Sequence, residues 1–239
     1  MGRAVVALLA TDERMHLAAA VDARGAATLG RDAGELAGAA VLGIAVTAVL
    51  VAALRGSDVV IDFSAVGAVP ALARAAAASR TPTVICTTGL DAEALAALEA
   101  LAALDALATI APIVVAANTS VGVTVLLHLA ARAAELLGDD YDIEILEMHH
   151  RRKVDAPSGT ALRLAESVAA ARGLDLATAA RYGRSGQVGA RTRDEIGILA
   201  LRGGDVVGEH TVVLAGDGER VELTHRAHAR DLFARGALR

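Results

Sequence analysis

The first half of the chain alternates short apolar runs with alanine-rich stretches, and this alternation constrains the fold more than any other feature of the sequence. Strand-length and helix-length segments that alternate in this way form βαβ units, whose strands pair into a parallel sheet. Strands are predicted at Met15–Val21, Asp58–Phe63, Thr83–Thr87 and Thr109–Ala116, and helices at Val69–Ala78 and at Ala92–Leu104 with Asp91 as its N-cap. The pattern predicts an α/β fold with a doubly wound parallel sheet of the Rossmann, nucleotide-binding type. Within the apolar segment Val41–Leu54, the part Thr47–Leu54 is a further candidate helix.

After Asn118 the pattern changes, which indicates a second domain. A long helix is predicted at Val121–Leu137, a strand at Tyr141–His149 and a helix at Ser158–Arg172. Three more strands are predicted at Asp194–Arg202, Val206–Ala215 and Arg220–Ala227, separated by Gly-Gly-Asp and Gly-Asp-Gly turns. This half is expected to be an α+β domain with a mixed or antiparallel sheet.

Charge and hydropathy limit the classes of partner that the chain is expected to bind. The net charge of −5 is spread along the chain without a basic block, so nothing is available to neutralise a nucleic-acid backbone. The longest apolar run, Val41–Leu54, has 14 residues, short of the roughly 20 that span a bilayer, and no membrane segment is predicted. The apolar run near the N-terminus is too short for a signal peptide, and a cytoplasmic location is expected. With one cysteine and scattered histidines, no metal site is predicted.

Among the residue types that occur only once, lysine and asparagine merit inspection. The chain has 23 basic residues, of which Lys153 is the single lysine, and Asn118 is the single asparagine. Because an arginine cannot release its proton near neutral pH, a position that keeps lysine in an arginine-rich chain is a candidate for proton transfer.

The segment Glu147–Ala161 concentrates the chemistry, because it holds two histidines and Lys153 within five residues between a predicted strand and a predicted helix. Ligands of α/β enzymes tend to lie where a strand end leads to a helix N-terminus, whose N–H groups are unpaired. Asp155 or Ser158 can cap the helix, and an anion such as a carboxylate fits at its first turn. A capped helix behind a solvated basic loop is the alternative interpretation.

This segment closely resembles the signature of the 4-hydroxy-tetrahydrodipicolinate reductase family, in which a His-His pair, a lysine and Asp-Ala-Pro-Ser-Gly-Thr-Ala follow in this order. The resemblance extends to four other segments, Ile61–Ser64, Thr87–Gly89, Ala116–Gly122 and Arg202–His210. It implies that His149 acts as acid/base and Lys153 as proton donor, and that His150, Gly159 and Thr160 bind the dicarboxylate substrate. It further implies reduction of 4-hydroxy-tetrahydrodipicolinate with NADH or NADPH in lysine and diaminopimelate synthesis, and a homotetramer built on the second-domain sheet.

The resemblance also predicts a nicotinamide cofactor site, although it is less complete there. Family members begin with a strand and a glycine-rich phosphate loop, and Met1 matches the end of that loop, so the chain resembles a version shortened at both ends. Asp22 would bind the adenosine ribose and favour NAD, since Ala23 stands where an arginine would accept the NADP phosphate. Cys86 replaces a glycine before two threonines, and Thr119 an aromatic residue. The predicted cofactor-binding residues are Met1, Asp22, Cys86, Thr87, Thr88, Ala116, Ala117, Asn118 and Thr119.

These observations divide the chain into a dinucleotide-binding domain at 1–117, incomplete at its N-terminus, a substrate-binding and oligomerisation domain at 118–229, and the start of a return to the first domain at 230–239. Another two-domain dehydrogenase, acting on a semialdehyde, is one alternative. A truncated, catalytically weak homologue that serves as a binding or assembly subunit is the other, and NADH titration separates it from the reductase. The chain is expected to bind NADH more weakly than a version extended upstream by about 15 residues, because the phosphate loop holds the pyrophosphate.

Overall fold

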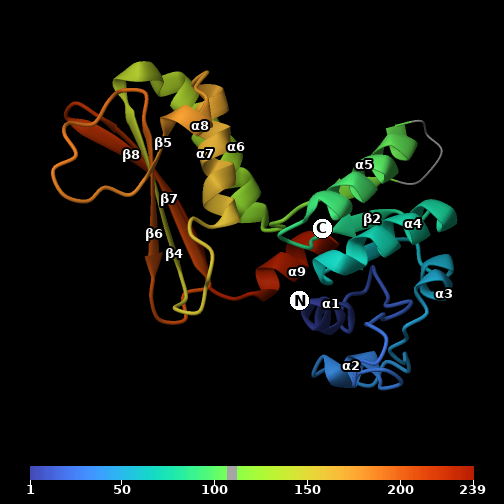
Figure 1. The fold of residues 1–239 in the computed structure, drawn as a ribbon. Coiled ribbons are helices and arrows are strands. Elements are labelled where there is room, and N and C mark those ends of the chain that lie inside the picture. The colour runs from blue at the N-terminus through green and yellow to red at the C-terminus, as the bar shows by residue number, and fades with distance from the viewer. Residues whose placement is uncertain (107–111) are drawn as a thin grey trace. The chain divides into compact units, whose positions relative to one another are not determined.

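The computed structural model describes residues 1–106 and 112–239 and divides into two compact units (Figure 1). The first unit consists of Met1–Thr119 together with Asp231–Arg239, and the second of Ser120–Arg230. Each unit has its own sheet and its own hydrophobic core, and each is considered by itself below.

A three-stranded parallel sheet organises the first unit. Its order is β1 (Val60–Asp62), β2 (Thr83–Ile85) and β3 (Ile113–Val115). The last residues of the three strands are in register, so their carboxyl ends share one edge of the sheet. The predicted parallel sheet is confirmed, although each strand is shorter than its pattern. The first residues of the strand predicted at Thr109–Ala116 lie outside the described residues.

Helices pack against this sheet through small side chains. The longer ones are α4 (Val69–Ser79) and α5 (Ala92–Ala106), which confirm the two predicted helices. Asp91 caps α5, since its carboxylate accepts a hydrogen bond of 2.9 Å from the N–H of Ala94. The helix α3 (Leu50–Arg55) covers only the end of the predicted Thr47–Leu54, and η1 (Val66–Ala68) precedes α4. Val69, Leu72, Ile85 and their neighbours form the core.

The segment Met15–Val21 is not a strand, contrary to the prediction. Its only β pairing among the described residues is a single bridge between Val21 and Thr47. Three consecutive alanines in this segment have little strand propensity, and Met15 instead packs into a small apolar cluster around Val5. The apolar pattern therefore reflects packing against a helix rather than pairing in the sheet.

Two helices that the sequence analysis did not assign hold that small cluster together. They are α1 (Gly2–Leu9) and α9 (Asp231–Leu238), whose buried residues Val5, Ala234 and Leu238 are in contact. A one-turn helix, α2 (Ala33–Leu36), follows Asp32, whose carboxylate accepts hydrogen bonds from the N–H groups of Glu35, Leu42 and Ile44. One side chain thus organises the loop that contains α2.

The second unit has a five-stranded mixed sheet, which confirms the predicted sheet type. Its order is β5 (Ala180–Tyr182), β6 (Ile196–Arg202), β4 (Asp142–His149), β7 (Gly208–Gly216) and β8 (Glu219–Ala227). The central strand β4 runs parallel to β6 and antiparallel to β7. The short strand β5 and the helix α8 (Leu176–Ala179) were not predicted.

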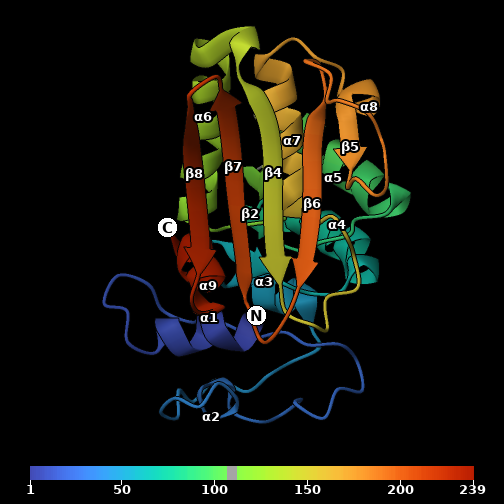
Figure 2. The same cartoon turned by 90° about the vertical axis from the view of Figure 1, so that its left-hand side faces the viewer.

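Two helices, α6 (Val121–Leu137) and α7 (Gly159–Ala171), lie on one face of the mixed sheet, and Figure 2 shows the other face uncovered. Both match the predicted ranges, and a short 3₁₀ turn, η2 (Gly138–Asp140), extends α6. Residues such as Ala130, Ile145, Leu164 and Val212 are fully buried between the layers. The strand side that faces the helices is therefore the inward side.

The stretch Val121–Asp140 is long and apolar enough to cross a membrane when only length and composition are considered. Four of its side chains, Val123, Leu126, Ala130 and Ala134, are nonetheless buried in the unit. Its other side carries the ion pair between Arg132 and Glu135, at 2.7 Å. An apolar face that packs on a sheet accounts for this composition.

Candidate active site

The turn between β4 and α7 brings the predicted catalytic residues together. His149 is the last residue of β4, and Ser158 is the N-cap of α7, with its hydroxyl oxygen accepting the N–H of Ala161 at 3.2 Å. A strand thus ends, and a helix begins, within the residues that separate His149 from Gly159. The predicted cap by Ser158 is confirmed.

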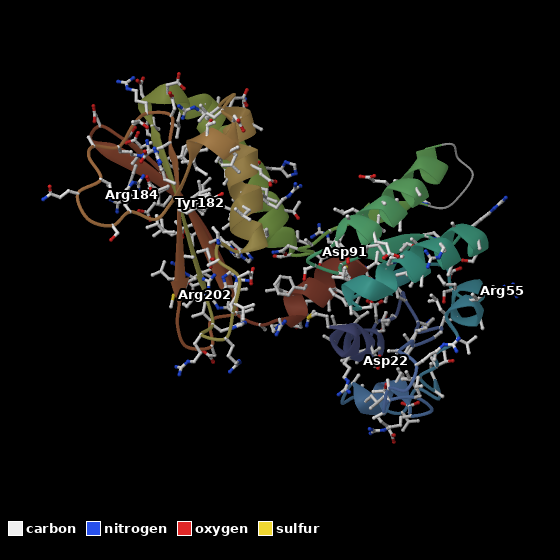
Figure 3. All side chains as sticks on the ribbon, in the orientation of Figure 1. Asp22, Arg55, Asp91, Tyr182, Arg184 and Arg202 are labelled. Atoms are coloured by element: carbon white, nitrogen blue, oxygen red, sulfur yellow. The ribbon has the colours of Figure 1, made fainter. Side chains whose placement is uncertain are left out.

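Glu147 lies at the centre of this turn, and its side chain is completely buried. One carboxylate oxygen accepts the N–H of Ser158 at 3.0 Å and the other lies 2.6 Å from Nδ1 of His149. Arg202, the last residue of β6, donates to both oxygens at 2.8 Å (Figure 3). Glu147 therefore joins the strand end, the helix start and the neighbouring strand.

Opposing effects set the charge of His149. Burial lowers the pKa of this imidazole, and the cations Lys153 and Arg202 lower it further, while hydrogen bonding to Glu147 raises it. The balance leaves the pKa of His149 below its ordinary value. The ring therefore loses its proton readily, as a proton-transfer group must.

A second histidine packs on the first. The rings of His149 and His210 meet edge to face with centroids 5.2 Å apart. Burial lowers the pKa of His210 to about 4, with the nearby His149 adding to the effect. Nε2 of His210 lies 3.1 Å from the hydroxyl of Ser158, so a neutral imidazole supports the cap of α7.

Lys153 is anchored within the same turn. Its ammonium donates to both carboxylate oxygens of Asp155, at 2.8 and 2.9 Å, and its backbone N–H donates to the carbonyl of His150. This ammonium lowers the pKa of Asp155 below its ordinary value. The only lysine of the chain is thus tied to Asp155 within the turn that follows His149.

The predicted substrate-binding residues lie on either side of this turn. Gly159 and Thr160 are the first two residues of α7, at the helix end that attracts anions. Gly159 is exposed, and a Cβ at this position would meet no atom within 4 Å, so a ligand has room to approach. His150 follows β4 directly and is partly buried.

Seven of the predicted cofactor residues, Cys86, Thr87, Thr88, Ala116, Ala117, Asn118 and Thr119, follow the carboxyl ends of β2 and β3. The N–H of Cys86 donates to the carbonyl of Asp62, and the N–H of Ala116 to that of Ile85. The segments 86–88 and 116–119 are therefore adjacent. Thr88 and Ala117 are exposed at this edge.

Side chains fix the Thr87 end of this edge. The buried carboxylate of Asp62 accepts the hydroxyl of Thr87 at 2.6 Å and the N–H of Ser64 at 3.0 Å. Cys86 is buried, and burial followed by the charge of Asp62 raises the pKa of its thiol to about 12. Cys86 thus packs in the interior as a neutral side chain. Thr119 donates its hydroxyl to the carbonyl of Phe233 at 2.6 Å.

Asp22 and Met1 belong to another part of the first unit. Asp22 follows the bridge residue Val21 and accepts hydrogen bonds from the hydroxyl of Thr28 and the N–H of Ala23 (Figure 3). These bonds, the first being the larger, and the charge of Arg3 lower its pKa, so the carboxylate is ionised. Met1 is the N-cap of α1.

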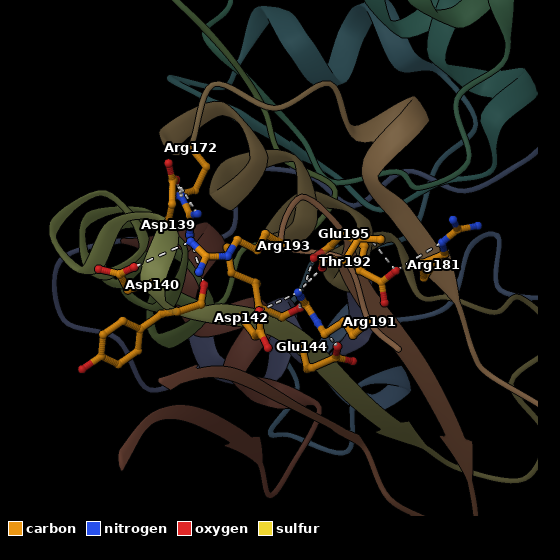
Figure 4. Close-up of polar contacts among 12 residues, drawn as sticks. Asp139, Asp140, Asp142, Glu144, Arg172, Arg181, Arg191, Thr192, Arg193 and Glu195 are labelled. Atoms are coloured by element: carbon orange, nitrogen blue, oxygen red, sulfur yellow. Dashed lines mark hydrogen bonds and ion pairs between the residues drawn. The ribbon is translucent and has the colours of Figure 1, made fainter. Parts of the chain in front are cut away.

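A network of ion pairs lies at the beginning of β4, the end of the strand away from His149, on the uncovered side of the sheet (Figure 4). Arg184 pairs with Glu144 and Glu195, and Arg191 pairs with Glu144 and Asp142. These contacts fasten the loop 183–195 to β4. The neighbouring strand leaves room for Glu144, since a Cβ on Gly197 would lie 1.8 Å from its carboxylate.

Sequence reasoning missed three residues of the site, namely Glu147, Arg202 and His210. One signal was present, because the inward positions of β4 run Ile143, Ile145, Glu147, and a carboxylate on an inward position requires partners. The partners could not be found in the same way. The register that places Arg202 opposite His149 is set by the folded sheet.

Comparison with known families covers both units. Residues 1–119 match the family described as dihydrodipicolinate reductase, N-terminus, and residues 122–239 match dihydrodipicolinate reductase, C-terminus.

The chain belongs to the dihydrodipicolinate reductase family.

Relatives in the family match over the full length of the chain. The 4-hydroxy-tetrahydrodipicolinate reductases of Thiobacillus denitrificans and Alkalilimnicola ehrlichii are 49% and 51% identical over 239 residues, which are 100% of this chain and 87% of each relative. A solved structure, the dipicolinate-bound dihydrodipicolinate reductase from Paenisporosarcina sp. TG-14, superimposes with a TM-score of 0.74 at 25% identity. The superposition covers 99% of this chain and 87% of the Paenisporosarcina chain.

This membership sets the reaction class. The named relatives are oxidoreductases of the reductase step of lysine biosynthesis, so the chain is an oxidoreductase of that step. Its first unit is the family's Rossmann-type nucleotide-binding domain, and the family uses pyridine nucleotides. The alternative of a silent binding or assembly subunit is not favoured, because the full chain matches named reductases.

Proposed function

We propose that the chain reduces 4-hydroxy-tetrahydrodipicolinate to tetrahydrodipicolinate with His149 and Lys153 supplying the proton. The observation that carries this proposal is the Glu147 carboxylate, which contacts both Nδ1 of His149 and the N–H of Ser158. An acid/base group and a helix start suited to a carboxylate are thereby held in one rigid turn.

The proposed chemistry divides between cofactor and protein. A bound nicotinamide supplies a hydride to the unsaturated ring of the substrate. His149 and the Lys153 ammonium hold the matching proton, and the depressed pKa of His149 favours its release. The first turn of α7, at Gly159 and Thr160, receives a substrate carboxylate, with His150 assisting.

Replacing His149 or Lys153 by alanine tests these roles. Each variant is expected to lose about 10²-fold or more in turnover, the usual scale for general acid catalysis. Arg152→Ala is the matched control, because Arg152 is an exposed cation of the same turn. Turnover within a few-fold of the wild type in both the His149 and the Lys153 variants would exclude the assignment.

The substrate turn has its own test with pyridine-2,6-dicarboxylate, the dipicolinate that is bound in the Paenisporosarcina reductase. It is expected to compete with the substrate. Gly159→Ala is expected to weaken this inhibition because the new methyl group projects into open space where the carboxylate would lie. Gly56→Ala, which also adds a methyl group in open space, is the control and should leave inhibition unchanged.

The cofactor is proposed to be NADH or NADPH, held at the strand ends by the segments 86–88 and 116–119, with Met1 at the start of α1 near the pyrophosphate. The open edge formed by exposed Thr88 and Ala117 supports this assignment. The ionised carboxylate of Asp22 favours ribose hydroxyls over a phosphate, so kcat/KM is expected to be higher with NADH. Asp22→Ala should bring the kcat/KM values for NADH and NADPH closer together. An unchanged ratio of these two values would contradict the role of Asp22.

Assembly is proposed to use the uncovered face of the mixed sheet, giving a homotetramer in the cytoplasm. Leu146 and Leu201 are 37% and 47% exposed. Their partners in register place them on the side of β4 and β6 away from the helices. Leu146→Glu is expected to reduce the mass measured by light scattering, whereas Leu136→Glu on α6 should not. A wild-type monomer would refute the proposal.

A further inference from the structure

Glu147 occupies a position where a charge is costly. It follows Ile143 and Ile145 on the inward side of β4, and its side chain has no exposed surface. A buried carboxylate costs several kcal/mol unless hydrogen bonds and an opposite charge compensate it. A carboxylate at this position is therefore stable only where hydrogen bonds and an opposite charge compensate its burial.

Four donors surround the carboxylate of Glu147. Oε1 accepts the N–H of Ser158 and Nη2 of Arg202, at 3.0 and 2.8 Å. Oε2 accepts Nη1 of Arg202 at 2.8 Å and lies 2.6 Å from Nδ1 of His149. The arrangement has one member that can change its protonation near neutral pH, and that member is His149.

The contact with His149 fixes the tautomer of the ring. An ionised carboxylate has only acceptors, so the 2.6 Å contact requires a proton on Nδ1 of His149. In the neutral ring, Nε2 then carries the lone pair. A Cβ at position 208 would lie 3.0 Å from this nitrogen, so Gly208 leaves space beside it that another residue would fill.

We infer that Glu147 is the positioning residue of the active site, which sets the orientation and tautomer of His149 and ties that ring to the start of α7 through the N–H of Ser158. The inference rests on the proposed catalytic role of His149. Glu147 acts through His149 and need not touch the substrate.

Arg202 keeps the proton on the imidazole. Burial alone would raise the pKa of Glu147, but hydrogen bonds from Arg202, His149 and Ser158 outweigh burial and lower it. Glu147 therefore stays ionised when His149 is neutral. A carboxylate without this guanidinium would compete for the proton on Nδ1.

The charges around His149 predict the direction of a pH effect. The groups that face the ring are Glu147 on β4, Arg202 on β6, His210 on β7 and Lys153 in the turn. Glu147 is the one whose interaction with His149 raises its pKa. Removing its charge lowers the pKa of His149 further, so a rate that depends on protonated His149 falls off at lower pH than in the wild type.

The experiment compares Glu147→Gln with the wild type by pH-dependent kinetics and by ¹⁵N NMR of the His149 ring. Glutamine keeps the shape but presents an N–H₂ group to Nδ1, which moves the ring proton to Nε2. We expect kcat to fall by about 10²-fold, the scale of a lost proton-transfer group. The alkaline limb of the kcat profile should shift to lower pH, and the KM for NADH should be unchanged.

Glu144→Gln is the matched control. Glu144 lies on the same strand and also pairs with two arginines, but it has no contact with His149. This variant should keep the wild-type pH profile and an Nδ1-protonated His149. Glu147→Asp keeps the charge and should restore the pH profile in part.

Two results would overturn the inference. One is a Glu147→Gln enzyme whose folded fraction keeps the wild-type kcat, pH profile and tautomer, which would make Glu147 purely structural. The other is a wild-type spectrum with the proton on Nε2 of His149, a measurement that needs no variant to fold. Full activity of His149→Ala would instead refute the proposed catalytic role, while the NMR tautomer would still report on Glu147.

Discussion

The two sheets of the molecule present their site residues in different ways. The strands β1, β2 and β3 of the first unit have three residues each, whereas β4 and β7 of the second have eight and nine. At the short strands, most of the proposed cofactor residues lie in the segments 86–88 and 116–119, which backbone hydrogen bonds connect to the neighbouring strands. At the long strands, the proposed catalytic residues are held by a buried network of charges. Substitutions in the first unit should therefore affect cofactor binding, and those in the second both turnover and stability.

The largest effect is expected from Arg202→Met in the second unit. The substitution leaves the buried Glu147 carboxylate without its guanidinium, and losing one partner of a buried pair costs about 3–5 kcal/mol. Urea unfolding followed by circular dichroism measures the loss. The control is Arg226→Met, which breaks an exposed pair with Glu209 and should cost less than about 1 kcal/mol. Equal losses of unfolding free energy in the two variants would show that the buried pair of Arg202 and Glu147 contributes no more than an exposed pair.

A smaller effect is expected from acid, again in the second unit. The pKa of His210 is about 4 in the folded chain against 6.5 for the free side chain, because burial disfavours the cation. As the pH falls from 6.5 towards 4, the unfolded chain takes up a proton that the folded chain does not, so stability decreases.

The decrease amounts to at most about 3 kcal/mol, since one pKa unit corresponds to about 1.4 kcal/mol. His149, Glu147, His225 and Lys153 also act on His210. Unfolding free energies at several pH values should show the slope in the wild type and a flatter one in His210→Gln. The exposed His128→Gln should keep the wild-type slope, and an identical slope in all three proteins would contradict the prediction.

The smallest effect is expected in the first unit, from Asp62→Asn. Thr87 and Ser64 lose a charged acceptor, and hydrogen bonds to charged groups contribute about 2 kcal/mol. The KM for NADH should rise while kcat at saturating NADH stays near the wild-type value. Asp58→Asn, at the exposed beginning of the same segment, is the control. A fall in kcat without a change in KM would show that the two units do not divide binding and turnover as described.

The sequence predicted secondary structure best where the spacing of apolar residues stays regular over many residues. The helix at Val121–Leu137 has the predicted bounds because 17 residues with one apolar face leave little ambiguity. Met15–Val21 failed because a short apolar run does not distinguish pairing in a sheet from packing on a helix. The helix α1 was missed for a related reason, since its apolar face is recognisable only beside α9.

The site was predictable to the extent that it is local in sequence. His149, Lys153 and Gly159 lie in one turn, so spacing alone brings them together. Arg202 reaches this turn through the parallel pairing of β6 with β4, and His210 through the antiparallel pairing of β7. Contacts across strands depend on register, which no single segment of the sequence reveals.

The close approach of Glu144 to Gly197 limits how this chain can change over time. Any side chain at position 197 would overlap the carboxylate, because even a Cβ lies 1.8 Å from it. A side chain at this position therefore forces the carboxylate of Glu144 to move away from its ion pairs. Shortening residue 144 removes one ion-pair partner from each of Arg184 and Arg191, which hold the loop 183–195. A side chain at position 197 and a shorter residue at position 144 would therefore weaken the same contacts between this loop and β4.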